Sequence, residues 1–384
     1  MKRVFFLSGL VLTQTLFATT LTIYNSGIAL VQESIAFKVT KADREFHYNN
    51  IPQTLLADSV AIDFPKDVTL NSEVYKNKKF LPRELAKESK LKPTLLFNIQ
   101  AATNHDTTVQ LNYLMSHIRF QSDYQLDIEK NRAKLTAWVD IENNSGKDFK
   151  DVSLNLIAGQ PHRANHYIKT LSYKSDMPVT QTNNISNRSI AGYHKYTLPA
   201  PITLNSYEKT RIKLFEYKHL SIENSYIAQM NNPLYLMGER SSSVTREVSL
   251  KGLQREAPAG KVRIYTEDEN EKLLLGEDNL GNTPKNSPIR LKVGKDFDTR
   301  VSQKLLSRND SDQFFHRKIE YSLSNHSDED KIITLHIPFN KKEHSKVISK
   351  QNYSYTKGNL VTFTLKVKAN SERSFDAEFI SKRR

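Results

Sequence analysis

The sequence predicts a mainly β protein with two or three antiparallel β-sandwich domains, the C-terminal one immunoglobulin-like, and few short helices. Segments of alternating apolar and polar residues recur along the chain, and turns rich in Asn, Ser and Gly separate them. The 384 residues suffice for several hydrophobic cores, and the 17 Tyr and 18 Phe argue against a disordered chain. No segment repeats at a fixed period, which argues against a propeller or a solenoid.

The first 18 residues have the pattern of a secretory signal peptide. Lys2 and Arg3 form a short basic region, the mostly apolar stretch 4–17 follows, and Ala18 offers a small residue for cleavage. An uncleaved N-terminal anchor is the alternative. No later segment reaches the ~18 consecutive apolar residues of a transmembrane helix. We therefore expect an exported protein, periplasmic or secreted, of a bacterial envelope, without a transmembrane segment.

Residues 19–80 are expected to form a small N-terminal β-domain of hairpins. Alternating segments end at Pro52 and Pro65, because proline donates no hydrogen bond to a sheet. The expected strands lie within 21–39, 45–51, 59–64 and 68–75. The charged segment 76–92 then predicts a linker with one short helix, in which Pro82 suits the first turn. A basic helix on a membrane surface is the alternative for this segment.

A central β-sandwich is expected over residues 81–240, with a long polar loop at 160–189. Its clearest pattern runs from Lys134 to Gly159, where two alternating segments flank the turn formers at 143–146. We interpret this stretch as one β-hairpin, with the chain's one Trp, Trp138, on the first arm.

A C-terminal β-sandwich is expected over residues 241–384. The spacing of its strand patterns is typical of an immunoglobulin-like sandwich, although no Cys-Trp-Cys core is present. The expected strands are 248–250, 261–265, 289–293, 319–323, 331–337, 360–367 and 375–380.

Several sequence patches carry a family resemblance in the same order along most of the chain. They are IYNSGIALVQE at 23–33, PTLLFNI at 93–99, LNYLMSHIRFQSDYQLDI at 111–128, IENNSGKDFKDVSLNLIAG at 141–159, AGKVRIY at 259–265 and LLGEDNLGNTPKNSPIRLKVGKDFD at 274–298. Together they resemble the DUF4139 family, whose better-known members are called mucoidy inhibitor A proteins. The chain departs from the family at Phe120, where members usually carry Trp. The resemblance implies a β-rich envelope or secreted protein and lends no catalytic residues.

The composition excludes several kinds of chemistry. The chain has no Cys, so a thiol nucleophile, a disulfide framework, a Cys-based zinc site and a lipoprotein anchor are all excluded. Nucleotide-binding glycine motifs and the G-x-S-x-G motif are absent. The formal net charge of +14 would attract lipopolysaccharide phosphates or acidic glycans, and a general richness in Lys is the alternative explanation. Nucleic acid is not an expected partner at a periplasmic address.

Two groups of residues are the candidates for a contact surface. His162, Arg163 and His166 lie in QPHRANHY, where the two imidazoles could bind zinc on a helix but are expected to decorate a loop. Tyr193, Tyr196 and Tyr217 belong to a Tyr-rich central region, and amphipathic aromatic residues suit interfaces. Tyr also fits half-buried strands, so the two interpretations stay open. We predict no catalytic residue, metal site or cofactor.

Two acidic stretches have a chemical and a structural interpretation. Oxygen ligands in GEDNLGN at 276–282 could hold calcium, but the spacing differs from that of an EF-hand, and turn capping is expected. Asp296 and Asp298 flank Phe297, where we expect a turn with a buried Phe rather than a pair of catalytic carboxylates.

The sequence thus predicts an exported envelope protein that binds or scaffolds without catalysis, with an envelope protein or an anionic glycan as the partner. The alternative is an envelope hydrolase acting on glycan or peptide through carboxylates that sequence alone does not pair. A third alternative is tethering to membrane or lipopolysaccharide through the positive charge, which salt would weaken.

Overall fold

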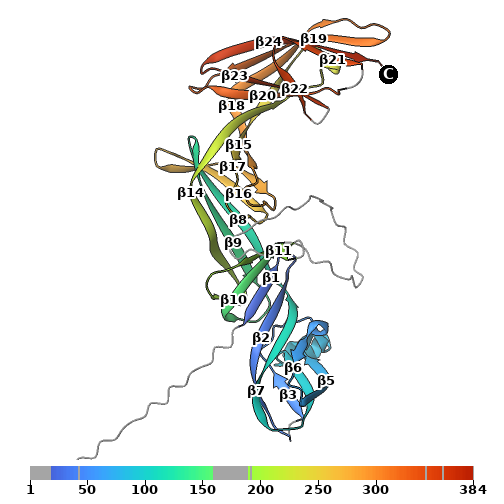
Figure 1. Cartoon of the computed structure of the whole chain (residues 1–384), viewed down its shortest axis with the longest axis vertical. Helices are drawn as coiled ribbons and strands as arrows, with labels where there is room; N and C mark the ends of the chain where they lie inside the picture. The colour runs from blue at the N-terminus through green and yellow to red at the C-terminus, as the bar shows by residue number, and fades with distance from the viewer. Residues whose placement is uncertain are drawn as a thin grey trace, which may run out of the picture. The chain divides into compact units, whose positions relative to one another are not determined.

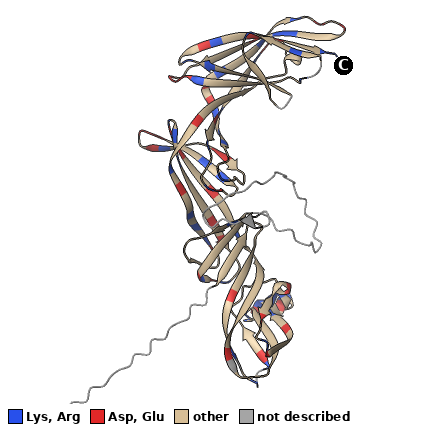
Figure 2. Ribbon diagram, viewed as in Figure 1, with Lys and Arg blue, Asp and Glu red and all other residues tan. Residues whose placement is uncertain are grey.

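The computed structural model describes residues 19–384 except 42–43, 159–188, 191–192, 342–343, 357–358 and 384. The chain divides into two compact units, Met1–Gln121 with Val139–Ile212 (unit 1) and Ser122–Trp138 with Lys213–Arg384 (unit 2). Strands make up most of both units, so the predicted mainly β class is confirmed (Figure 1). Lys and Arg occur along strands and turns of both units, interspersed with Asp and Glu (Figure 2).

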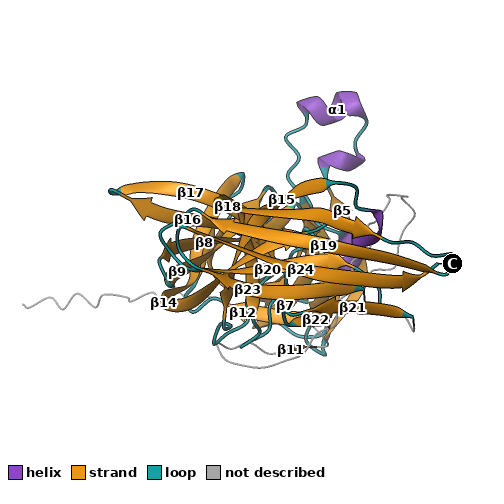
Figure 3. Cartoon of the chain, turned by 90° about the horizontal axis from the view of Figure 1, so that it is seen from above, coloured by secondary structure: helices purple, strands orange, loops and turns teal. Residues whose placement is uncertain are grey.

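Helices are few and short, as predicted. They are the 3-10 turns η1 (Ala57–Ser59), η2 (Lys78–Phe80) and η3 (Pro233–Tyr235) and the helix α1 (Arg83–Glu88). α1 and η2 occupy the charged segment for which a linker with one short helix is expected (Figure 3). No helix in the described part of the chain is long and apolar enough to span a membrane.

The main sheet of unit 1 follows the order β11-β12-β10-β1-β2-β7-β4, with β13 also paired to β10. Its strands are β1 (Thr20–Tyr24), β2 (Ile28–Val39), β4 (Ala61–Asp63), β7 (His105–Ser116), β10 (Phe149–Ala158), β11 (Ser189–Ile190), β12 (Tyr193–Thr197) and β13 (Ile202–Leu204). Most pairs are antiparallel, but β1 lies parallel to β10, with Leu21 opposite Leu154. β1, the first described strand, therefore lies between β2 and β10 and joins these two strands into one sheet.

A second, smaller sheet of unit 1 has the order β3-β6-β5. Its strands are β3 (Glu45–Tyr48), β5 (Val68–Lys76) and β6 (Thr94–Ala101). The central strand β6 buries Leu95, Phe97 and Ile99, because both of its neighbours and the main sheet cover it. These side chains join one core with the inward residues of β1, β2, β7 and β10.

The stretch from Lys134 to Gly159 is not a hairpin, which corrects the interpretation made from its pattern. β9 (Arg132–Asn143) pairs with β8 (Ile118–Glu129) and β14 (Glu208–Gln229), whereas β10 pairs with β1, β12 and β13. The two arms therefore belong to different sheets, and the turn between them crosses from one layer to the other. Val139 and Ile141 of β9 share the unit 1 core with the inward residues of β10. Alternation predicts strands and their buried faces, but it does not choose their hydrogen-bonding partners.

Unit 2 contains two hydrophobic cores. The first lies among β8, β9, β14 and the strands β15 (Glu239–Leu250), β16 (Gly260–Asp268), β17 (Glu271–Leu280) and β18 (Ile289–Arg308). The second adds β19 (Phe314–Asn325), β20 (Lys331–Pro338), β21 (Ser345–Ser349), β22 (Tyr353–Thr356), β23 (Leu360–Val367) and β24 (Ser371–Lys382).

The C-terminal strands form one folded sheet path, β21-β24-β19-β18-β15-β14-β20-β23-β22. Tyr321 of β19 and Phe379 of β24 pack with Phe363 of β23 in one core, so the two ends of this path face each other as two layers. A sandwich-like C-terminus agrees with the predicted class, and its immunoglobulin-like topology stays a prediction.

The two compact units are a different division of the chain from the successive domains expected with boundaries near residues 80 and 240, and those domains stay a prediction. Each of the strands β8, β9 and β14 has residues in both units. Long strands of this kind leave no linker of distinct composition between compact parts, so a boundary inside them carries no compositional signal.

Candidate functional site

A cavity of about 600 Å³ opens in unit 1 beside the turn between β9 and β10. Five segments contribute to its wall: Thr19 before β1, Glu33 of β2, the loop 49–53 after β3, the pair Lys92 and Pro93 before β6, and residues 146–152. This volume lies within the range of about 300–1,000 Å³ that small-ligand sites occupy.

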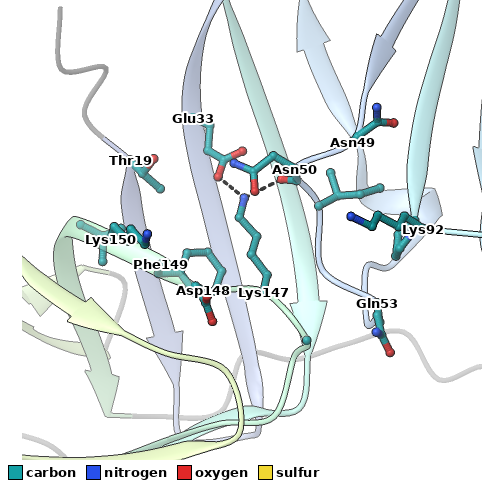
Figure 4. A pocket seen from close by; sticks show the side chains of 14 residues that line it. Thr19, Glu33, Asn49, Asn50, Gln53, Lys92, Lys147, Asp148, Phe149 and Lys150 are labelled. Carbon is teal, nitrogen blue, oxygen red and sulfur yellow. Dashed lines mark hydrogen bonds and ion pairs between the residues drawn. The ribbon is translucent and has the colours of Figure 1, made fainter. Parts of the chain in front are cut away.

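A buried ion pair forms the floor of the cavity. The ammonium of Lys147 contacts the carboxylate of Glu33, and their side chains are only 5% and 6% exposed (Figure 4). The same ammonium donates to the carbonyl of Asn50 at 2.7 Å and to the hydroxyl of Tyr113 at 3.0 Å. Tyr48 donates its hydroxyl hydrogen to the other Glu33 oxygen at 2.7 Å. Every hydrogen of the ammonium thus has an acceptor.

Burial sets the protonation of the groups around this ion pair. It raises the pKa of Tyr113 and Tyr48 above the usual range, and the Glu33 charge adds to both shifts. Both tyrosines therefore stay protonated at neutral pH. Burial also lowers the pKa of Lys147, while the Glu33 carboxylate acts in the opposite direction. The lysine nitrogen has no free lone pair while it donates three hydrogen bonds, so the geometry does not present a nucleophile.

The turn that carries Lys147 is built around the buried side chain of Asn143. Its amide donates to the carbonyls of Lys147 at 2.9 Å and Leu204 at 3.1 Å, and its oxygen accepts from the hydroxyl of Ser145 at 2.7 Å. Gly146 follows with φ of +80°, and a Cβ there would meet the Gln53 side chain at 3.0 Å. An Asn-x-Ser-Gly sequence suits this turn because Asn and Ser bond to nearby backbone and Gly tolerates positive φ.

The rim of the cavity is polar and carries two unpaired cations. Lys92 and Lys150 are exposed, and neither has an ion-pair partner in the described part of the chain. In Figure 4 they lie to either side of the ion pair between Lys147 and Glu33. Exposed amides of Asn49 and Gln53 complete this rim. Ammonium and amide groups above a neutralised floor can hold a polar ligand that carries negative charge.

The two carboxylates of the lining are both engaged by donors. Glu33 accepts from Lys147 and Tyr48, and Asp148 accepts from the backbone N–H of Ser206 at 2.8 Å. A general acid would need a carboxyl whose pKa is raised. Among the carboxyl groups of the described residues, burial raises the pKa of Glu73, which lies on β5 and does not line the cavity. The arrangement therefore suits binding better than proton transfer.

Of the residues proposed for a contact surface, the structure describes the side chains of Tyr196 and Tyr217. His162, Arg163 and His166 lie outside the described residues, and of Tyr193 only its place in β12 is described. Tyr196 is 4% exposed and belongs to the unit 1 core. Tyr217 lies in unit 2, half-buried, with its ring 5.7 Å from that of Phe215. A contact surface that includes these residues stays a prediction.

The acidic stretches have structural roles. Glu277 accepts from Arg263 at 2.9 Å, Asp278 accepts from the backbone N–H of Lys292 at 2.7 Å, and Asn282 accepts from that of Ala259 at 2.8 Å. Within the described residues, no group of three or more His, Cys, Asp and Glu side chains could hold a metal ion. Phe297 is 87% exposed inside β18, so the expected turn with a buried Phe is wrong.

Sequence reasoning missed the polar cluster of Glu33, Tyr48, Tyr113 and Lys147. A signal was present in β2, where Glu33 falls on the same face as the buried Val31 and Phe37. A charged residue at an inward position of an alternating strand predicts a buried partner, because an unpaired buried charge is strongly unfavourable. The partner itself, 114 residues later, has no local signal.

Comparison with protein families finds a match to a domain of unknown function, DUF4139, over residues 109–382. A comparison with curated proteins finds no match. The matched region includes the turn and β10 side of the cavity, and the remaining lining residues precede it. Because the match covers more than half of the sequence, the chain belongs to the DUF4139 family.

Proposed function

We propose that this protein is an exported envelope protein that binds an anionic glycan in the unit 1 cavity without catalysing a reaction. The proposal rests on one observation. The ion pair at the floor of the cavity is buried and neutral overall, whereas the rim is exposed to solvent and positively charged. Lys147 and Glu33 neutralise each other, whereas Lys92 and Lys150 are exposed and unpaired within the described chain. A ligand with a carboxylate or phosphate would therefore find free donors at the rim and rigid walls below.

The chemistry of the lining favours a sugar over an apolar ligand. Asn49 and Gln53 offer amide donors and acceptors to hydroxyl groups, and Phe149 lines the same cavity with an apolar ring. Export is supported by the signal-peptide pattern of residues 1–18. If cleavage follows Ala18, the new α-amino group belongs to Thr19, which also lines the cavity. That group would add a third positive charge beside the two rim lysines.

The test measures binding of oligosaccharides to the chain from residue 19 onward by isothermal titration calorimetry. An oligoglucuronate is compared with a neutral gluco-oligosaccharide of the same length. We expect the acidic sugar to bind at least about tenfold more tightly, a difference of about 1.4 kcal/mol, and its affinity to fall as salt is added. Equal binding of the two sugars, or no binding of the acidic one, would overturn the proposal.

The rim lysines are tested by the double variant Lys92→Gln and Lys150→Gln. We expect it to lose about tenfold or more in affinity for the oligoglucuronate, because both free cations of the rim are removed. The matched control is Lys38→Gln with Lys76→Gln, which removes two exposed lysines of unit 1 that do not line the cavity. An equal loss in both variants would show a dependence on net charge alone. Shortening of the sugar during long incubation would instead favour the hydrolase alternative.

A further inference from the structure

The segment between β5 and β6 concentrates positive charge that the cavity does not use. Residues 77–91 contain five Lys and Arg and two Glu. η2 and α1 lie within it, and Figure 3 shows α1 standing clear of the strands of unit 1. We call these residues the basic projection. Its charge density contrasts with the interspersed charges of the strands.

A second hollow of about 510 Å³ lies within the basic projection. Its wall contains no acidic residue and is made of Lys78, Lys79, Leu81, Arg83, Ala86 and Lys87. None of these four cations has an ion-pair partner in the part of the chain that the structure describes. Four unpaired cations around one hollow repel each other, so an anion that enters it removes an unfavourable interaction.

Large apolar side chains stand beside these cations and face solvent. Phe80 is 61% exposed and Leu85 is 60% exposed. The ammonium of Lys79 lies 5.1 Å from the ring centres of both Phe80 and Tyr75, so one cation stays close to the exposed ring. A soluble phosphate would use the cations and leave the apolar side chains in water. A lipid surface offers phosphate and an apolar layer together.

We propose that the basic projection binds the phosphate headgroups of an anionic phospholipid surface. The ammonium and guanidinium groups of the hollow contact the phosphates, and Phe80 and Leu85 enter the layer between headgroups and acyl chains. Cations near an anionic bilayer and a few inserted apolar side chains add to each other in this mode of binding. The site is independent of the glycan cavity, since none of its four cations lines that cavity.

The test is co-sedimentation of the chain from residue 19 onward with vesicles of phosphatidylcholine, with and without phosphatidylglycerol. We expect binding to the anionic vesicles only, and a steep loss of it as salt is added. Replacement of Lys78, Lys79, Arg83 and Lys87 by Gln should weaken this binding by at least about tenfold. Replacement of Phe80 and Leu85 by Ser should also weaken it while the net charge is unchanged.

The matched control replaces four exposed cations of β18, Lys292→Gln, Lys295→Gln, Arg300→Gln and Lys304→Gln. This control variant loses four positive charges, as the variant of the basic projection does. We expect it to retain most of the binding to anionic vesicles. An equal loss in this control would reduce the effect to net charge and overturn the proposal. So would unchanged vesicle binding in the Phe80 and Leu85 variant, which would leave an anion site without lipid specificity. All replaced side chains are exposed, so circular dichroism should show the same fold in every variant.

Discussion

At the scale of single residues, Lys147 of unit 1 is a buried cation with three hydrogen-bond acceptors. It is buried, it contacts Glu33, and its hydrogen bonds reach the loop after β3 through Asn50 and strand β7 through Tyr113. One side chain therefore ties the turn before β10 to three other parts of the unit. A buried ion pair of this kind adds little net stability over an apolar pair, but removal of one partner leaves an uncompensated charge.

The variant Lys147→Met should reduce the free energy of unfolding by about 3–5 kcal/mol, because Glu33 then loses its buried partner. The double variant Glu33→Leu with Lys147→Met should recover much of this loss, since no charge remains buried. Urea unfolding of the wild type, both single variants and the double variant gives the coupling energy through a double-mutant cycle. Additive losses, with no coupling between the two sites, would contradict the assignment of this pair.

At the scale of elements, two turns in different units use the same side-chain device. Asn143 ends β9 and Asn325 ends β19, and these residues are 1% and 0% exposed. As in the Asn143 turn, the amide of Asn325 donates to the carbonyl four residues later, at 2.8 Å, and to a distant carbonyl, that of Lys368, at 3.0 Å. Each turn is followed by a buried lysine, and Lys331 contacts Asp296 at 2.7 Å. In both places the device fixes a turn between two consecutive strands that do not pair with each other.

The variants Asn143→Ala and Asn325→Ala should each reduce the free energy of unfolding by about 2–3 kcal/mol, because buried carbonyls lose their donors. Asn144→Ala is the matched control within the first turn, since the Asn144 side chain is exposed and donates to the Glu142 side chain at 2.9 Å, while its backbone hydrogen bond to His117 does not depend on the side chain. It should change stability by no more than about 0.5 kcal/mol. Urea unfolding monitored by circular dichroism compares the three variants. Equal effects of Asn143→Ala and Asn144→Ala would refute the role of the buried amide.

At the scale of the whole molecule, carboxylates held by cations link stability to pH. Hydrogen bonds from Arg317 hold the pKa of Asp310 well below its usual range, and Arg119 and Lys366 lower the pKa of Glu142 and Asp330 in the same way. A group whose pKa is lower in the folded state stabilises the fold above its unfolded pKa, near 4, and loses that contribution as pH falls. With a formal net charge of +14, acidification also increases repulsion between cations.

The chain should therefore lose stability as pH falls from about 5 to about 2, with little change between about 6 and 8. Asp310→Asn should be less stable than the wild type at neutral pH, because the buried Arg317 loses its carboxylate. Its stability should also depend less on acid, so the two proteins should become more alike as pH falls. Urea unfolding midpoints of the wild type and of Asp310→Asn, measured across this pH range, test this prediction. Parallel pH curves for the two proteins would rule out this role for Asp310.

The amino-acid sequence by itself determined the mainly β class, most of the strands, the turn at 143–146 and the family. These are local properties, because alternation and turn chemistry depend on residues close in sequence. It did not show that β9 and β10 join different sheets, that Tyr196 is buried, or that Phe297 is exposed.

Only the tertiary structure decided the candidate sites. Glu33 and Lys147 are separated by 114 positions in the chain, and the cavity above them is formed by five segments. The pairing of strands depends on which distant segments share a core, and periodicity within one strand carries no information about that choice. The sequence also does not show which Lys and Arg side chains lack an ion-pair partner. The distance from each cation to the nearest carboxylate depends on the fold, so only the structure identifies the unpaired cations of the cavity rim and of the basic projection.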